Sequence, residues 1–151
     1  MESENTVAAE MMRKYGKDIL DLCAYIPYFS EKGKKDVEQP YDGKYGESKL
    51  QFRVFDSTLL SFVKRAQNSA LMDKNYLYVY SRNRIKTHAD ERKFIERATI
   101  RDVDALRGII SRYVLEGQRK AVRWGEGVEE KIYLNVLLKL KGFIDFYKKP
   151  D

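Results

Sequence analysis

The 151-residue sequence predicts a mainly α-helical protein, folded as an irregular bundle of four to six helices, with a short β-hairpin as an option around residues 37–54. Apolar residues recur at intervals of three and four along several long segments, as they do on one face of a helix. Capping residues precede these segments, and the alternation typical of strands occurs only once. Because 13% of the residues are aromatic, we expect one folded domain over 1–151.

The first helix is predicted from about Thr6 to Phe29, with Asn5 or Thr6 as its cap. Gly16 weakens the middle by about 1 kcal/mol, so the helix can break there. Pro27 is expected to end or kink it, because proline lacks an amide hydrogen and its ring clashes with the preceding turn. The apolar stripe comprises Val7, Met11, Tyr15, Ile19, Leu22 and Ile26.

Residues 31–49 read as a long loop, because glycine, proline and charged residues punctuate them. Loops of this length inside a domain are usually functional or mobile. Leu50, Phe52 and Val54 then alternate with polar residues, which predicts a short strand. Its partner in a hairpin would be the region of Val37.

Three helical segments are expected in the middle of the chain. Asp56 or Ser57 caps a helix that ends near Leu71, with Leu59, Leu60, Val63, Ala66 and Ala70 on its apolar side. Residues 75–80 have high β-propensity between helical segments and read as either a short helix or an extended connector. Thr87 and Asp90 form an acidic capping box for a short helix through Phe94 and Ile95.

Two longer helices complete the chain. Thr99 and Asp102 cap the first, in which Val103, Leu106, Ile110 and Tyr113 share a face and Gly117 lies near the end. Residues 125–127 are expected to form a turn. The apolar face of the last helix comprises Ile132, Tyr133, Val136, Leu137, Leu140, Ile144 and Tyr147. Ile132, Leu138 and Phe143 add apolar residues beside this face, so a homodimer and a monomer with a deeply buried helix are both open.

Composition limits the classes of function. No apolar run approaches the roughly 18 residues of a membrane span, and the acidic, polar start does not resemble a secretory signal. We therefore expect a cytoplasmic protein that does not bind a membrane. The single cysteine excludes an internal disulfide and a cysteine-rich metal site. The net charge of +6 favours acidic partners.

No catalytic, metal-binding or cofactor-binding motif is recognisable. His88 is the only histidine, and its place just after the cap Thr87 is typical of an exposed residue at a helix start. Cys23 lies beside the apolar stripe of the first helix, where a buried cysteine acts as a small hydrophobe. The glycines form no nucleotide-binding pattern. The sequence therefore favours a protein that is not an enzyme and has no cofactor.

The strongest lead is the basic segment from Ser81 to Arg123. It holds twelve basic and six acidic residues, and nine of the twelve are arginine, whose planar fork suits phosphate. The candidate binding surface comprises nine basic residues and a tryptophan that could stack on bases: Arg82, Arg84, Arg92, Lys93, Arg97, Arg101, Arg112, Arg119, Arg123 and Trp124. The alternative is that these arginines pair with neighbouring carboxylates.

Two functions are favoured, and a third, a small enzyme that would show a deep pocket with convergent polar groups, also stays open. The first is a protein-interaction module, such as an inhibitor or adaptor of the kind that mobile elements encode, with a protein partner. The second is binding of nucleic acid or nucleoprotein through an arginine-rich surface between residues 81 and 123, for which affinity would fall steeply with salt.

Three segments, DILDLCAYIPYF (18–29), SFVKRAQNSALMDKNY (61–76) and residues 106–144, together resemble a family of small bacterial helical proteins of unknown function. That family carries an Arg-Gly-Glu-Arg-Phe helix before a final amphipathic helix. Here Gly117 and Arg119 match this motif, whereas Glu116, Gln118 and Lys120 replace its other residues. The resemblance implies a single helical domain and no known reaction. Two interpretations of the motif stay open: it carries the family's activity, which this protein would then have lost or altered, or it is a structural joint between two helices, as the glycine suggests.

Overall fold

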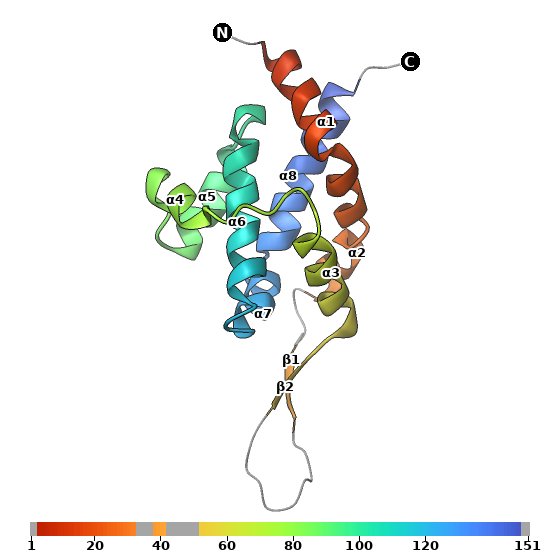
Figure 1. Ribbon diagram of the computed structural model, residues 1–151, viewed down its shortest axis with the longest axis vertical. Helices are drawn as coiled ribbons and strands as arrows, with labels where there is room; N and C mark the ends of the chain where they lie inside the picture. Colours follow the sequence, from red (N-terminus) through yellow and green to blue (C-terminus); the bar gives the residue numbers. More distant parts are fainter. Residues whose placement is uncertain (1–2, 33–37, 42–51, 149–151) are drawn as a thin grey trace, which may run out of the picture.

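The computed structural model describes residues 3–32, 38–41 and 52–148 and confirms a mainly helical bundle (Figure 1). Its described part holds eight α-helices: α1 (Glu4–Cys23), α2 (Ile26–Lys32), α3 (Ser57–Gln67), α4 (Tyr76–Arg82), α5 (His88–Arg97), α6 (Val103–Glu116), α7 (Val122–Glu129) and α8 (Ile132–Tyr147). A 3-10 turn, η1 (Ile100–Asp102), precedes α6. There are more helices than expected because the first predicted helix is split and α7 replaces a predicted turn.

Helix α8 lies at the centre of the arrangement and packs against α1, α2, α5, α6 and α7. Its predicted apolar face is confirmed, because six of the seven residues are buried and Tyr147 is half-buried. The start of α1 and the end of α8 lie at the same end of the molecule (Figure 1), where the Tyr147 hydroxyl donates to the Glu4 carboxylate at 2.8 Å.

The first predicted helix is wrong in two respects. Its cap is Ser3, whose hydroxyl accepts the amide of Thr6 at 3.2 Å, so neither Asn5 nor Thr6 caps it. The helix continues through Gly16 and ends at Cys23, and Pro27 is the second residue of α2. The proline ring would clash with the carbonyl four residues earlier, at Cys23, which explains why the break precedes the proline.

The optional hairpin is present. Strands β1 (Glu38–Tyr41) and β2 (Phe52–Phe55) pair antiparallel, with Glu38 opposite Phe55 and Tyr41 opposite Phe52. They extend from the end of the bundle where α2 and α3 lie (Figure 1). The loop predicted over 31–49 is therefore wrong at residues 31–32, which end α2, and at 38–41, which form β1. Residues 33–37 and 42–49, and Leu50 of the predicted strand, lie outside the described residues.

Helix α3 has the predicted cap, since Asp56 accepts the amide of Thr58 at 2.8 Å, but it ends at Gln67. Leu60 and Ala70 are exposed, so the predicted apolar side is wrong at these two positions. The buried stripe follows helical spacing through Phe62 instead, and comprises Leu59, Phe62, Val63 and Ala66. Residues 76–82 form the helix α4, which packs on α6, so tertiary contact outweighs the β-propensity of its tyrosines.

Both predicted capping boxes are confirmed. The Thr87 hydroxyl accepts the amide of Asp90 at 3.1 Å, and the Asp90 carboxylate accepts the amide of Thr87 at 3.2 Å. Thr99 and Asp102 exchange the same kind of contacts at the start of η1. The predicted face of α6 is buried along its whole length.

The predicted turn at residues 125–127 is wrong, because these residues lie inside α7. The chain reverses instead at Lys131, which adopts a left-handed conformation with φ of 60°. Gly127 is required by packing, since a Cβ there would overlap the ring of Tyr133. That ring is fully buried, and its centroid lies 4.9 Å from that of Phe62 and 5.4 Å from that of Phe29.

Two glycines in helices provide a matched test of this packing. We expect Gly127→Ala to lower the free energy of unfolding by about 1–3 kcal/mol, because the added methyl group displaces a buried aromatic ring. Gly142→Ala should raise it by up to about 1 kcal/mol, because a Cβ at this position in α8 meets no other atom within 4 Å. Urea unfolding of the three proteins measures both changes. A loss of stability in Gly142→Ala as large as that in Gly127→Ala would contradict the conclusion that only Gly127 packs against a buried ring.

Candidate functional site

The ten residues of the predicted binding surface lie on several separate parts of the molecule. Arg92 lines a groove beside α8, whereas Arg82 and Arg101 line a hollow between α4 and the start of α6. Arg112 and Arg123 line a pocket formed by α5, α6 and α7. The other basic members are exposed along α5 or in the connections between helices: Arg84, Lys93, Arg97 and Arg119.

Several of these arginines pair with carboxylates, as the alternative interpretation predicts. Arg92 donates to Glu130 at 3.1 Å, so this ion pair joins α5 to the end of α7. Glu116 lies 3.5 Å from Nε of Arg112 and 3.3 Å from Nε of Arg123. Arg123 also donates to Glu126 at 2.7 Å.

Trp124 joins two helices. It is half-buried, and its indole nitrogen donates to the carbonyl of Val114 at 2.9 Å. A Cβ at Gly117 would overlap this indole, so the glycine allows α6 and α7 to approach each other. Gly117 therefore lies at a close contact between two helices, which agrees with the structural one of the two interpretations that the sequence left open.

The most unusual charged residue is Glu91, whose side chain is buried among α4, α5 and α6. The Tyr113 hydroxyl donates to its two carboxylate oxygens at 2.7 and 2.9 Å, and Tyr80 donates to one of them through a short hydrogen bond. His88 Nδ1 lies 2.8 Å from the carboxylate oxygen that Tyr80 does not contact, Oε1 of Glu91. Since a buried charge is costly unless it is hydrogen-bonded, these donors make the burial of Glu91 tolerable.

Glu91 also orients the only histidine. A carboxylate accepts hydrogen bonds and donates none, so Nδ1 of His88 carries a hydrogen and Nε2 is the ring nitrogen left for a ligand. The imidazole is 41% exposed, whereas the carboxylate is 2% exposed. A carboxylate behind an imidazole is the arrangement by which proteins fix the tautomer and direction of a histidine.

The surroundings of Glu91 raise the pKa values of the two tyrosines that contact it, Tyr80 and Tyr113. Burial raises the pKa of Tyr113 far above its usual value, and the hydrogen bond to Glu91 raises it further. Burial and the negative charge of Glu91 likewise raise the pKa of Tyr80. Both hydroxyls therefore stay protonated and donate to the carboxylate at neutral pH.

A small pocket opens beside this cluster, with a volume of about 230 Å³. We call it the Glu91 pocket, and it is lined by Lys86, Thr87, His88, Glu91, Arg112, Tyr113 and Arg123. The guanidinium carbon of Arg112 also lies 4.5 Å from the ring centroid of Tyr80. Side chains from three helices and the preceding connection thus converge on one hollow.

Sequence reasoning missed this cluster, although one signal was present. Glu91 stands three and four residues before Phe94 and Ile95, which are both buried, so it occupies a core position of the α5 pattern. An acidic residue at such a position is typical of a satisfied buried polar network. His88 lies three residues before Glu91 on the same face.

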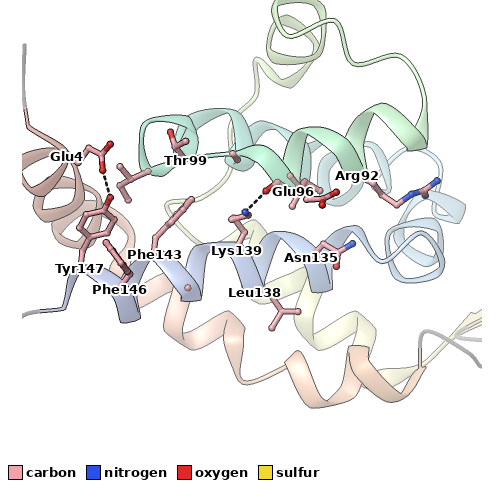
Figure 2. A pocket seen from close by; sticks show the side chains of 14 residues that line it. Glu4, Arg92, Glu96, Thr99, Asn135, Leu138, Lys139, Phe143, Phe146 and Tyr147 are labelled. Atoms are coloured by element: carbon pink, nitrogen blue, oxygen red, sulfur yellow. Dashed lines mark hydrogen bonds between the residues drawn. The ribbon is translucent and has the colours of Figure 1, made fainter.

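A larger groove of about 920 Å³ runs between α5, η1 and α8 (Figure 2). We call it the α5–α8 groove. Residues of α5 and the following turn form one wall, including Arg92, Ile95, Glu96, Thr99 and Ile100, and the other wall is the face of α8 that carries Asn135, Leu138, Lys139, Gly142, Phe143 and Phe146. Figure 2 shows Lys139 reaching from α8 to α5, where its ammonium donates to the carbonyl of Glu96 at 2.7 Å.

Two apolar side chains of this groove are unusually exposed. Phe146 is 78% exposed and Leu138 is 47% exposed, and Gly142 lies midway between them. The three residues stand at intervals of four and so form one ridge of α8. Of the three additional apolar residues predicted beside the main face of the last helix, Ile132 is buried in the core, whereas Leu138 and Phe143 line the groove.

The remaining candidates from the sequence were the single cysteine and metal-ligating side chains. Burial raises the pKa of the half-buried Cys23 thiol, whereas an activated cysteine needs a lowered pKa. Among the described residues, no group of three histidine, cysteine or acidic side chains is placed to hold a metal ion. No described helix combines the length and apolar character that crossing a membrane requires.

The hydrogen bonds to Glu91 predict a stability effect. We expect Tyr113→Phe to lower the free energy of unfolding by about 1–3 kcal/mol, because the buried carboxylate loses a donor. Tyr78→Phe is the matched control, since Tyr78 is 64% exposed and its loss should change stability by less than about 0.5 kcal/mol. Equal effects in urea unfolding at neutral pH would exclude a stabilising role for the network.

The raised tyrosine pKa values also predict an alkaline transition. The pKa values of Tyr80, Tyr113 and Tyr133 are higher in the folded than in the unfolded protein. Their contribution to stability is thus complete below about pH 10, the pKa of an unfolded tyrosine, and is lost as the pH rises above it. Urea unfolding between neutral pH and pH 11 measures this loss, which should be smaller in Tyr113→Phe. A constant stability across this range would contradict the burial of these hydroxyls.

In comparisons with models of protein families, with curated proteins and with solved structures, no match to this chain was found. The resemblance to a bacterial family of unknown function therefore stays a prediction. The Glu91 pocket and the α5–α8 groove are the two features from which a function can be argued.

Proposed function

We propose that the chain is a protein-interaction module that binds an amphipathic helix of a partner protein in the α5–α8 groove. The single observation that carries this proposal is the exposed ridge of Leu138, Gly142 and Phe146 along the groove. An inhibitor or adaptor is the form of this function that the sequence predicts.

The exposed aromatic supports the proposal on energetic grounds. A fully buried phenylalanine removes about 150–250 Å² from water, and such residues dominate the energetics of interfaces. Phe146 is 78% exposed and stands on the same ridge as Leu138, and the groove that they line also contains polar residues such as Asn135 and Thr99. An apolar strip with a polar rim is the usual anatomy of a protein-binding site.

The ridge favours a helical partner. Residues at intervals of four form the ridges that pack into the grooves of a second helix. Gly142 makes a notch between two large side chains, and a Cβ there meets nothing within 4 Å apart from its two chain neighbours and the backbone of its own helix. A glycine inside a helix costs about 1 kcal/mol relative to alanine, and internal packing gives no reason for it here. A partner helix that crosses α8 closely at Gly142 supplies that reason.

The charges around the groove favour protein over nucleic acid. Lys141 and Asp145 form an exposed ion pair at 3.0 Å on α8, and Arg92 of the opposite wall is paired with Glu130. Binding to the many phosphates of a nucleic-acid backbone requires several unpaired positive charges along one surface. The distribution of the predicted arginines over separate surfaces supports the same choice. The chemistry of the partner is thus an amphipathic helix with apolar residues on one face and charges of both signs beside them.

Site-specific photocrosslinking in cells of the native host tests this proposal. With p-benzoylphenylalanine in place of Phe146, we expect a crosslink to an amphipathic helix of one partner protein. Leu77 on α4 is the matched control position, since it is 64% exposed and does not line the groove. The synthetic partner helix should then bind the purified protein, and Phe146→Asp should weaken binding by about 30-fold or more.

Three results would contradict the proposal. These are equal capture at positions 146 and 77, capture of nucleic acid, and a partner peptide whose affinity does not change in Phe146→Asp. A crosslink to a second copy of the chain would assign the groove to self-association and not to a partner.

A further inference from the structure

Independently of the groove, we propose that the Glu91 pocket binds a phosphate group, either as inorganic phosphate or as the phosphate end of a small monoester. The pocket is formed by different residues from those of the α5–α8 groove and involves the histidine that the sequence pattern assigned to an ordinary helix start. Its charge, its size and the way its side chains are held favour this ligand.

The charge of the lining residues favours an anion. Lys86, Arg112 and Arg123 are cationic, and Glu91 is the one acidic residue among the lining side chains. Both oxygens of Glu91 already accept hydrogen bonds from buried or half-buried donors, so this carboxylate is stabilised within the protein. Two carboxylates outside the lining, Glu116 and Glu126, pair with Arg112 and Arg123, so Lys86 is the lining cation for which no ion pair is found among the described residues. A phosphate anion would meet this ammonium together with the guanidinium N–H groups that the two carboxylates leave free.

The two arginines are positioned by carboxylates that do not line the pocket. Glu116 lies within 3.5 Å of Nε of both, and Glu126 accepts from Nη1 of Arg123 at 2.7 Å. A guanidinium has five N–H donors, so these contacts leave donors on both arginines. Their side chains are 29% exposed, so solvent screens their charges less than those of fully exposed arginines. Arginines held in this way suit the planar, bidentate recognition of phosphate.

The histidine adds a directed group to the same hollow. Glu91 and Tyr113 hold Nδ1 of His88 at 2.8 and 3.2 Å, so the ring has a fixed orientation before a ligand arrives. Its Nε2 can accept a hydrogen bond from a phosphate hydroxyl when neutral and donate one to a phosphate oxygen when charged. Preorganised side chains of this kind lower the entropic cost of binding.

The size of the pocket limits the ligand. A volume of about 230 Å³ corresponds to about eight water molecules at about 30 Å³ each. Pockets for drug-sized ligands are larger, at about 300–1,000 Å³. The pocket therefore accommodates a phosphate group with a small substituent, and a whole nucleotide would leave its base outside.

The single histidine makes the test direct. We would titrate the untagged protein with inorganic phosphate and with phenyl phosphate, at constant pH and ionic strength, and follow the imidazole nitrogens of His88 by NMR. We expect a saturable shift with a dissociation constant of about 1 mM or below. Tighter binding of phenyl phosphate assigns the site to a monoester, and tighter binding of inorganic phosphate assigns it to the free ion.

Substitutions distinguish specific binding in the pocket from nonspecific attraction of anions to a basic protein. Lys86→Ala and Arg123→Gln should each weaken binding by about tenfold, whereas Arg119→Gln, at an exposed arginine that does not line the pocket, should leave it unchanged. Lys86 is exposed, so Lys86→Ala should retain the fold. If Arg123→Gln does not fold, Lys86→Ala alone tests whether the pocket binds phosphate. A shift that does not saturate, that sodium chloride reproduces, or that is equal in all three variants would overturn the proposal.

Discussion

The rest of the structure depends on the burial of Tyr133. Its ring belongs to α8 and packs against Phe29 of α2, Phe62 of α3 and Tyr113 of α6, while Gly127 of α7 leaves space for it. Among the described residues its hydroxyl has no hydrogen-bond partner, which costs about 1–3 kcal/mol. The large apolar area of the ring offsets this cost, so one side chain determines how five helices meet.

The orientation of α8 follows from that packing. With Tyr133, Val136, Leu137, Leu140 and Ile144 turned inward, residues 138, 142 and 146 must lie on the opposite side of the helix. The exposed ridge of the α5–α8 groove is thus a consequence of the core. Helix α5 serves both candidate sites, because Arg92, Ile95 and Glu96 line the groove while His88 and Glu91 line the pocket.

Local signals in the sequence predicted much of the fold. Thr87, Asp56 and Thr99 were identified as caps because capping needs only residues within one turn. The buried faces of α6 and α8 follow a helical period that is visible in the chain. The turn expected at residues 125–127 was wrong because Gly127 is needed to make room for the ring of Tyr133. That contact lies in the tertiary structure, and no pattern of neighbouring residues indicates it.

The sequence by itself determined that the chain is helical, where most helices begin, which faces are buried and that arginine is concentrated in one segment. Tertiary structure alone decided that the arginines separate onto different surfaces, that Glu91 and His88 meet Tyr80 and Tyr113, and that an apolar ridge stays exposed beside α5. The physical reason is range. Caps and helical periods are interactions within a few residues. The tyrosines of the Glu91 cluster come from residues 11 to 25 positions away, and the two walls of the α5–α8 groove are joined over 43 positions, so their proximity depends on how the helices pack.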